Sequence, residues 1–170
     1  MAGALALRAE ELVARLEQRG LLIATAESCT AGRLAALLAD APGASAVLDG
    51  GFITYTKQAK QVLLGVPEES LSTPGGAVTP DVARAMAAGA LSRSNATLAV
   101  ALTGVLGPAC DEDDNPVGRL DIACAWEGGT RHRRHELGEA EHDRLTEKAL
   151  DAALTLLDET LDTMAASRGR

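Results

Sequence analysis

Short apolar runs alternate along this chain with segments whose apolar residues recur at helical spacing. Residues 21–26, Leu-Leu-Ile-Ala-Thr-Ala, form the clearest apolar run, and they follow an amphipathic segment that ends at Arg19-Gly20. Apolar runs of this length predict buried strands, and the helical spacing between them predicts helices. Helices interleaved with buried strands are typical of a layered α/β domain. The predicted strands cover residues 21–26, 47–55 and 96–102, and the predicted helices cover residues 4–19, 33–38, 57–64 and 79–91.

The C-terminal third adds a hairpin and one long helix. Residues 117–126 and 131–137 predict two strands that meet at Glu127-Gly128-Gly129, and leucines at helical spacing follow. A length of 170 residues suits one compact domain. We therefore predict a single domain over residues 1–170, an α/β fold built as a three-layer α/β/α sandwich around a mixed, mainly parallel sheet. The tail, residues 165–170, is expected to fray.

Charge and composition exclude several classes of partner. The formal net charge is -8, and Phe52, Tyr55 and Trp126 are the only aromatic residues. Nucleic acids and anionic membranes need a basic surface, and base stacking needs aromatic side chains, so neither kind of partner is expected. The basic run at residues 131–135 is interpreted as the solvated edge of a strand.

Cysteines and acidic residues favour a cytoplasmic protein without a metal site. Cys29, Cys110 and Cys124 form no C-x-x-C pair, which fits a reducing compartment. Because no apolar run reaches ~18 residues and the N-terminus lacks a signal-peptide core, we expect neither a membrane span nor export. The acidic run at residues 111–114 lacks the glycine and the distal glutamate of a calcium loop, so it is interpreted as a solvated loop.

Three predicted strand exits carry residues that could perform chemistry. Ligands of such sheets bind beyond the carboxyl ends of the strands, here residues 27–32, 55–60 and 103–107. Ser28 lies where a strand turns into a helix, which suits a nucleophile or an anion site, although a simple helix cap is the commoner use. Tyr55 and Lys60 follow another strand, and a desolvated lysine can act as a base. Taken alone, they are explained as well by a packing residue and a surface charge.

The order and spacing of several motifs resemble the CinA C-terminal domain family over nearly the whole chain. The motifs are T-A-E-S-C-T-A-G at residues 25–32, Y-x-x-x-x-K at residues 55–60 and T-G-V-L-G-P at residues 103–108. This resemblance implies the hydrolysis of nicotinamide mononucleotide to nicotinate mononucleotide and ammonia. It also implies that the reaction uses no metal and no cofactor, and that the protein is a homo-oligomer, for which we expect a dimer.

The resemblance further implies roles for individual residues. Ser28 falls on the family's nucleophile, and Tyr55 and Lys60 fall on the pair that activates it. A serine hydroxyl needs a nearby base to become nucleophilic, so a Ser–Tyr–Lys site is chemically coherent. The substrate contacts that the resemblance implies are Thr30, Gly32, Ser45, Thr103, Gly104 and Gly107.

The chain departs from the family pattern on the side expected to bind phosphate. Lys57 stands where the family pattern Y-S-N-x-x-K has its asparagine. The acidic residues 111–114 replace a loop that is glycine-rich in the family. His142 stands where the family has a phosphate-binding arginine, and a histidine lacks the bidentate guanidinium fork. Arg119 and Arg144 are the candidates to compensate for that arginine.

Two other interpretations stay open at this point. The altered phosphate side favours a non-catalytic or re-purposed relative that binds a different nucleotide or a protein partner. In the second alternative Cys29 is the nucleophile, with a thiol pKa lowered by the helix N-terminus.

Overall fold

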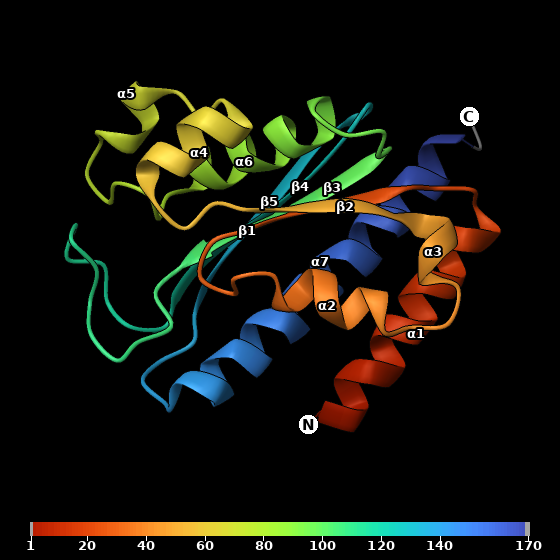
Figure 1. Ribbon diagram of the computed structural model, residues 1–170, viewed down its shortest axis with the longest axis horizontal. Coiled ribbons are helices and arrows are strands. Elements are labelled where there is room, and N and C mark those ends of the chain that lie inside the picture. The colour runs from red at the N-terminus through yellow and green to blue at the C-terminus, as the bar shows by residue number, and fades with distance from the viewer. Residues whose placement is uncertain (1, 169–170) are drawn as a thin grey trace.

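A five-stranded sheet with the strand order β2-β1-β3-β4-β5 forms the centre of the structure, a computed structural model that describes residues 2–168 (Figure 1). None of the helices within these residues is both long and apolar enough to cross a lipid bilayer. The strands are β1 (Ile23–Glu27), β2 (Leu48–Ile53), β3 (Leu98–Gly104), β4 (Arg119–Trp126) and β5 (Gly129–Glu136). The helices are α1 (Ala2–Gln18), α2 (Arg33–Ala39), α3 (Ala44–Val47), α4 (Lys57–Leu64), α5 (Glu68–Leu71), α6 (Pro80–Ser92) and α7 (His142–Arg168).

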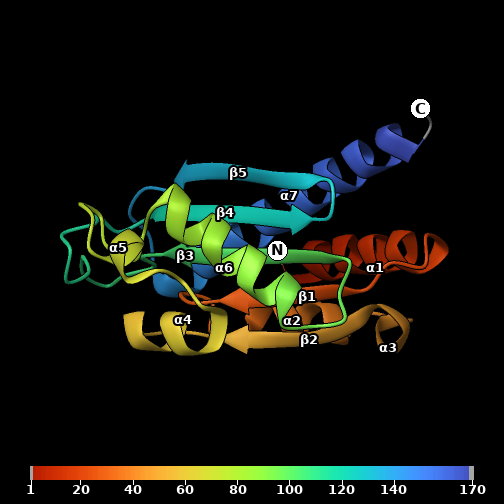
Figure 2. The ribbon, with the colours of Figure 1, turned by 90° about the horizontal axis from the view of Figure 1, so that it is seen from above.

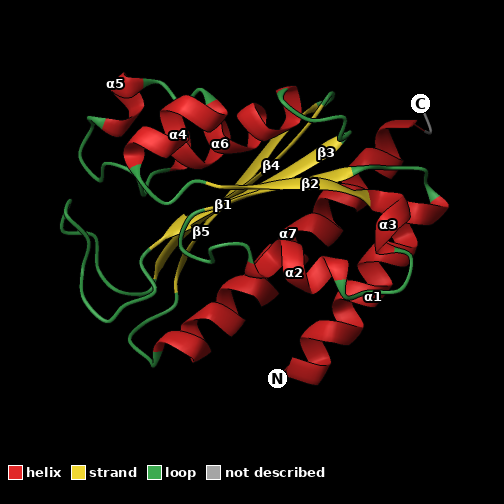
Figure 3. Cartoon of the chain, viewed as in Figure 1, coloured by secondary structure: helices red, strands yellow, loops and turns green. Residues whose placement is uncertain are grey.

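The strand directions bring three strand exits to one edge of the sheet. β1 pairs in parallel with both β2 and β3, whereas β4 is antiparallel to β3 and to β5. Only β4 therefore runs against the other strands, which confirms the predicted mixed, mainly parallel sheet with its terminal hairpin. The carboxyl ends of β1, β2 and β3 lie together at one edge, and the long loop between β3 and β4 projects beyond it (Figure 3).

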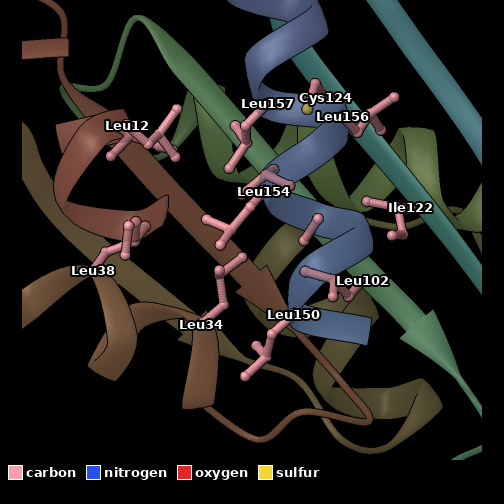
Figure 4. Close-up of a cluster of buried hydrophobic side chains, with 14 of the residues drawn as sticks. Leu12, Leu34, Leu38, Leu102, Ile122, Cys124, Leu150, Leu154, Leu156 and Leu157 are labelled. Carbon is pink, nitrogen blue, oxygen red and sulfur yellow. The ribbon is translucent and has the colours of Figure 1, made fainter. Parts of the chain in front are cut away.

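Helices cover both faces of the sheet, as predicted for a three-layer sandwich. Helices α4, α5 and α6 lie on one face, and α1, α2 and α7 lie on the other (Figures 1 and 2). Large side chains such as Leu102 and Ile122 pack against leucines of α2 and α7 on the second face (Figure 4). Alternate residues of β3, Ala99 and Ala101, point to the other face, where α6 packs against them. Small strand residues thus let α6 lie close to the sheet.

Most predicted helices and strands are confirmed, with differences at their ends. Thr79 caps α6 as expected, because its hydroxyl oxygen accepts a hydrogen bond from the Val82 N–H, and Pro80 is the first helical residue. The sequence did not predict α3 and α5, since helices of four residues are too short to show a periodic pattern. Helix α7 continues to Arg168, so residues 165–168 of the tail expected to fray are part of this helix. Residues 169–170 of that predicted tail lie outside the described residues.

Carboxylates pair with the basic run on the edge strand β5. On one face of the strand, Arg131 and Arg133 both pair with Glu159 of α7. On the other face, His132 and Arg134 contact the buried carboxylate of Asp121 at 2.7 Å and 2.8 Å. β5 is an edge strand with Arg133 and Arg134 exposed, as the interpretation held, and these ion pairs also join it to β4 and α7.

Candidate active site

A cavity opens where the carboxyl ends of β1, β2 and β3 meet. Its volume is about 400 Å³. Its walls come from the turn after β1, from the start of α4 and from the loop that follows β3. These are the three strand exits that the sequence singled out, so the rule for open α/β sheets located the cavity correctly.

Ser28 and Lys60 form a buried, hydrogen-bonded pair in the wall of this cavity. The Lys60 Nζ atom donates to Ser28 Oγ at 2.8 Å. It also donates to the main-chain oxygens of Thr54 at 2.7 Å and Tyr55 at 3.4 Å. Ser28 is 7% exposed and Lys60 is fully buried. Three acceptors thus hold the amine in one position against the serine hydroxyl.

The start of α4 explains how Lys60 reaches Ser28. Thr56 caps this helix by accepting a hydrogen bond from the Ala59 N–H at 3.0 Å, which fixes the first turn that carries Lys60. The Thr54 N–H donates to the Glu27 main-chain oxygen at 2.8 Å, which ties the end of β2 to the end of β1. Two strand exits and one helix cap therefore set the distance between Ser28 and Lys60.

Burial prepares Lys60 to act as a base. It lowers the pKa of the Lys60 amine from 10.5 to about 8, because desolvation disfavours the charged form. A lysine in ordinary solvent is almost wholly protonated at neutral pH, whereas a pKa of about 8 leaves roughly a tenth of this amine neutral at pH 7. In that form the nitrogen lone pair can accept the proton of the Ser28 hydroxyl.

Glu27 organises the turn that presents Ser28, a role that the sequence pattern did not predict. Its fully buried carboxylate accepts hydrogen bonds from the Thr30 hydroxyl at 2.6 Å and from the N–H groups of Gly32, Leu34 and Ala35 at 2.8–3.1 Å. The positive end of α2 is thereby occupied by an anion of the chain itself. A glutamate that ends a buried strand directly before a helix was the signal that could have revealed this cap.

Two of the implied substrate contacts are consequently engaged elsewhere. Thr30 is fully buried and donates its hydroxyl proton to Glu27, and the Gly32 N–H donates to the same carboxylate. Neither residue lines the cavity, so the structure does not bring them to the site, and their role as substrate contacts stays a prediction. The anion site expected at the helix N-terminus near Ser28 is occupied by Glu27 for the same reason.

Ser45 also lies away from the cavity. It is exposed on α3, which precedes β2, whereas Tyr55 and the cavity follow β2. A strand therefore separates Ser45 from the site, and the contact predicted for it stays a prediction. The other three implied contacts, Thr103, Gly104 and Gly107, do line the cavity.

Cys29 lies beside the pair but lacks the properties of a nucleophile. Burial raises the pKa of its thiol to about 12. The prediction of a lowered thiol pKa is thus wrong in direction, since desolvation outweighs the nearby helix end. A thiol with this pKa supplies very little thiolate at neutral pH.

Tyr55 lines the cavity with a side chain that is 70% exposed. Its main-chain oxygen contacts Lys60, but within residues 2–168 its hydroxyl makes no hydrogen bond to Ser28 or Lys60. The structure therefore brings Ser28 and Lys60 into contact and leaves the Tyr55 hydroxyl at the rim. An activating role for Tyr55 stays a prediction.

The acidic loop forms the mouth of the cavity. Asp111, Glu112 and Asp113 all line it. Lys57 at the start of α4 faces this loop, and its Nζ lies 2.9 Å from an Asp113 carboxylate oxygen and 3.2 Å from Glu112 Oε1. The solvated loop that we predicted is therefore attached to α4 by a contact that the sequence pattern did not predict.

The other candidate cations do not line the cavity. The His142 Nδ1 atom lies 3.1 Å from the main-chain oxygen of Leu106, so it supports the loop after β3. Arg119 pairs with Glu136 at 3.0 Å. Arg144 is exposed on α7. Among residues 2–168, no group of three or more His, Cys, Asp or Glu side chains is placed to hold a metal ion.

Fold and site together define an α/β sandwich with a buried serine–lysine pair at the carboxyl edge of its sheet. Residues 6–161 match the CinA C-terminal domain. The chain therefore belongs to the CinA family, as its motifs indicated.

Individual relatives agree with this assignment. A CinA-like protein of Anaeromyxobacter sp. (strain K) is 43% identical over 148 residues, which cover 87% of this chain and 36% of that protein. The crystal structure of competence/damage inducible protein CihA from Agrobacterium tumefaciens has a TM-score of 0.87 at 38% identity, covering 93% of this chain and 95% of that chain. A CinA superfamily protein from Klebsiella pneumoniae 700603 has a TM-score of 0.88 at 30% identity, covering 94% and 98%.

The curated relatives are longer than this chain. The matched regions span 26%, 28% and 36% of three of them, including the Anaeromyxobacter protein. The chain thus corresponds to one part of those proteins.

Proposed function

We propose that this protein is an amidohydrolase that uses Ser28 as its nucleophile and Lys60 as its general base. The observation that carries the proposal is the 2.8 Å hydrogen bond between a buried lysine of lowered pKa and a serine that lines a cavity. Serine becomes nucleophilic when a neighbouring base removes its proton, and this geometry suits that transfer.

The reaction would proceed through an acyl-enzyme. The neutral Lys60 amine takes the proton of Ser28 as Oγ bonds to the carboxamide carbon of the substrate. The resulting ammonium gives that proton to the departing nitrogen, the C–N bond breaks, and ammonia leaves. Water then attacks the ester with Lys60 again as the base, which releases the carboxylate and restores the serine hydroxyl. The oxygens of Thr54 and Tyr55 hold Nζ in place throughout.

The proposed substrate is nicotinamide mononucleotide, which would yield nicotinate mononucleotide. This choice rests on the resemblance of the motifs to the CinA family, and a cavity of about 400 Å³ is large enough for a mononucleotide. Within the cavity Thr103, Gly104 and Gly107 would contact the substrate, and Tyr55 would contact it from the rim. We propose the cytoplasm as the location, which agrees with three unpaired cysteines.

Ammonia release from nicotinamide mononucleotide tests the proposal. Ser28→Ala and Lys60→Met should each lower kcat by at least about 10³-fold, because each removes one half of the nucleophile–base pair. Ser92→Ala, at the far end of α6, and Lys148→Met, on α7, are the matched controls and should retain wild-type rates. Wild-type turnover in Ser28→Ala, confirmed by mass spectrometry of the purified variant, would refute the assignment.

The second candidate function is nucleotide binding without hydrolysis. The carboxylates at the cavity mouth and His142 in place of the family's arginine weigh against the family's substrate, and so favour a different ligand. Calorimetric binding of a nucleotide that the protein does not deamidate, under conditions where the fold is intact, would favour this alternative.

A further inference from the structure

Two departures from the family pattern lie against each other in space. Lys57 and Asp113 are 56 positions apart in sequence, yet Lys57 Nζ lies 3.0 Å from Asp113 Oδ1 and 2.9 Å from Oδ2. Glu112 adds a third oxygen at 3.2 Å. One contact thus explains two departures from the family's pattern, a lysine and an acidic loop.

The surrounding residues fix the position of the Asp113 carboxylate. A Cβ atom added to Gly76, whose φ is +50°, would overlap the Asp113 carboxyl group. Asp111 supports the loop from within, because its carboxylate accepts hydrogen bonds from the N–H groups of Asp113 at 3.1 Å and Asn115 at 2.8 Å. Asp111 is therefore committed to the loop, whereas Asp113 and Glu112 are committed to Lys57.

The charges around the cavity leave one cation for an anionic substrate. Among the described residues, only Lys57 and Lys60 line it as cations, and Asp111, Glu112 and Asp113 line it as anions. Lys60 is fully buried against Ser28, so it is not available to a phosphate. Lys57 remains 32% exposed on its side chain and could turn from the carboxylates to a ligand.

We propose that Lys57 is the residue that receives the phosphate of the substrate, and that Asp113 and Glu112 are built-in anions that compete for it. The phosphate binds by exchange: it takes the place of these carboxylates around Nζ. This inference rests on the proposed function for its choice of substrate. Its consequence is that the pair sets how well the pocket distinguishes a mononucleotide from the nucleoside that lacks the phosphate.

Electrostatics predicts opposite effects on mononucleotide binding when the carboxylates or the lysine are removed. Removal of the carboxylates frees Lys57 and relieves repulsion of a phosphate dianion, so mononucleotide binding improves. Removal of the lysine leaves three carboxylates at the mouth, so mononucleotide binding weakens. Nicotinamide riboside carries a pyridinium cation and no phosphate. Neither change should therefore alter its binding in the direction expected for the mononucleotide.

The test compares kcat/KM for nicotinamide mononucleotide with that for nicotinamide riboside. The ratio should rise about tenfold or more in the double variant Glu112→Gln/Asp113→Asn and fall about tenfold in Lys57→Met. Lys57→Arg keeps the charge and should restore most of the ratio. Asp114→Asn, which neutralises an exposed carboxylate that does not line the cavity, is the matched control and should leave the ratio unchanged.

A merely structural pair would give a different result. If loosening the loop were the only effect, both substrates would lose kcat/KM by the same factor and the ratio would stay constant, which would overturn the inference.

A binding measurement separates this inference from the proposed hydrolysis. Calorimetry with nicotinate mononucleotide and nicotinate riboside needs no turnover, and the affinity ratio should follow the same order across the variants. Ratios that move as expected without any ammonia release would support Lys57 as the phosphate residue and refute the hydrolysis. Ammonia release with unchanged affinity ratios would support the hydrolysis and refute Lys57 as the phosphate residue.

Discussion

Lys60 has two properties that rarely occur together, complete burial and three acceptors around its nitrogen. Burial disfavours its ammonium form, whereas the Ser28 hydroxyl and two main-chain oxygens give both its charged and its neutral form hydrogen-bonding partners. The result is an amine that can exchange a proton near neutral pH without moving. This is the requirement for a base that serves both half-reactions.

The pH dependence of the reaction should report this amine. Because the neutral form is active and burial lowers the pKa of Lys60 to about 8, log(kcat/KM) should rise by about one unit per pH unit below pH 8 and level off above it. An unperturbed lysine would keep the rise going beyond about pH 10. Initial rates of ammonia release across this range measure the profile. A flat profile between about pH 6.5 and 8.5 would exclude Lys60 as the base.

Tyr55 provides a second test at this scale. Its hydroxyl has no hydrogen bond to the Ser28–Lys60 pair, so Tyr55→Phe should keep kcat within about threefold of wild type. Tyr55→Ala removes the ring from the cavity rim and should chiefly raise KM. Steady-state kinetics of both variants checks this expectation. A loss of about 10²-fold or more in kcat for Tyr55→Phe would restore the hydroxyl to the activating role that the motif implies.

At the scale of single elements, the turn from β1 into α2 depends on Glu27. Glu27→Ala removes the acceptor of four buried or half-buried donors, so the free energy of unfolding should fall by about 2–4 kcal/mol. Glu27→Gln keeps one acceptor oxygen and should cost less. Urea denaturation measures both, with Glu10→Gln, exposed on α1, as the control. A loss below about 0.5 kcal/mol for Glu27→Ala would contradict the role of this carboxylate as a cap.

The same turn shows what a sequence can reveal about a site and what it cannot. The positions of Ser28 and Lys60 at strand exits followed from apolar runs and helix signals, and the parallel strand order brought them together. The hydrogen bonds that Thr30 and Gly32 donate to Glu27 could not be predicted in this way. A sequence motif does not show which hydrogen-bond donors already have an acceptor. The contact of Lys57 with Asp113 was equally hidden, since it joins residues 56 positions apart across a loop without periodic pattern.

At the scale of the whole molecule, the exposed apolar side chains bear on assembly. Ile53 at the end of the edge strand β2 is 55% exposed, and Val62 on α4 is 70% exposed. The main-chain groups of an edge strand can pair with a second chain, which would also cover apolar side chains beside it. We expect a dimer, as the family resemblance implies, and expect Ile53→Glu/Val62→Glu to shift it toward the monomer. Sedimentation equilibrium measures the shift. An unchanged mass would remove this surface from consideration.

The occupied helix end beside Ser28 also sets the direction in which a substrate enters. Since Glu27 fills the positive end of α2 and Lys60 is buried against Ser28, the cation left for an anionic group is Lys57 at the mouth of the cavity. A molecule with an amide at one end and a phosphate at the other must then enter amide first. Its charged end would then lie beside Lys57 and the acidic loop, near solvent.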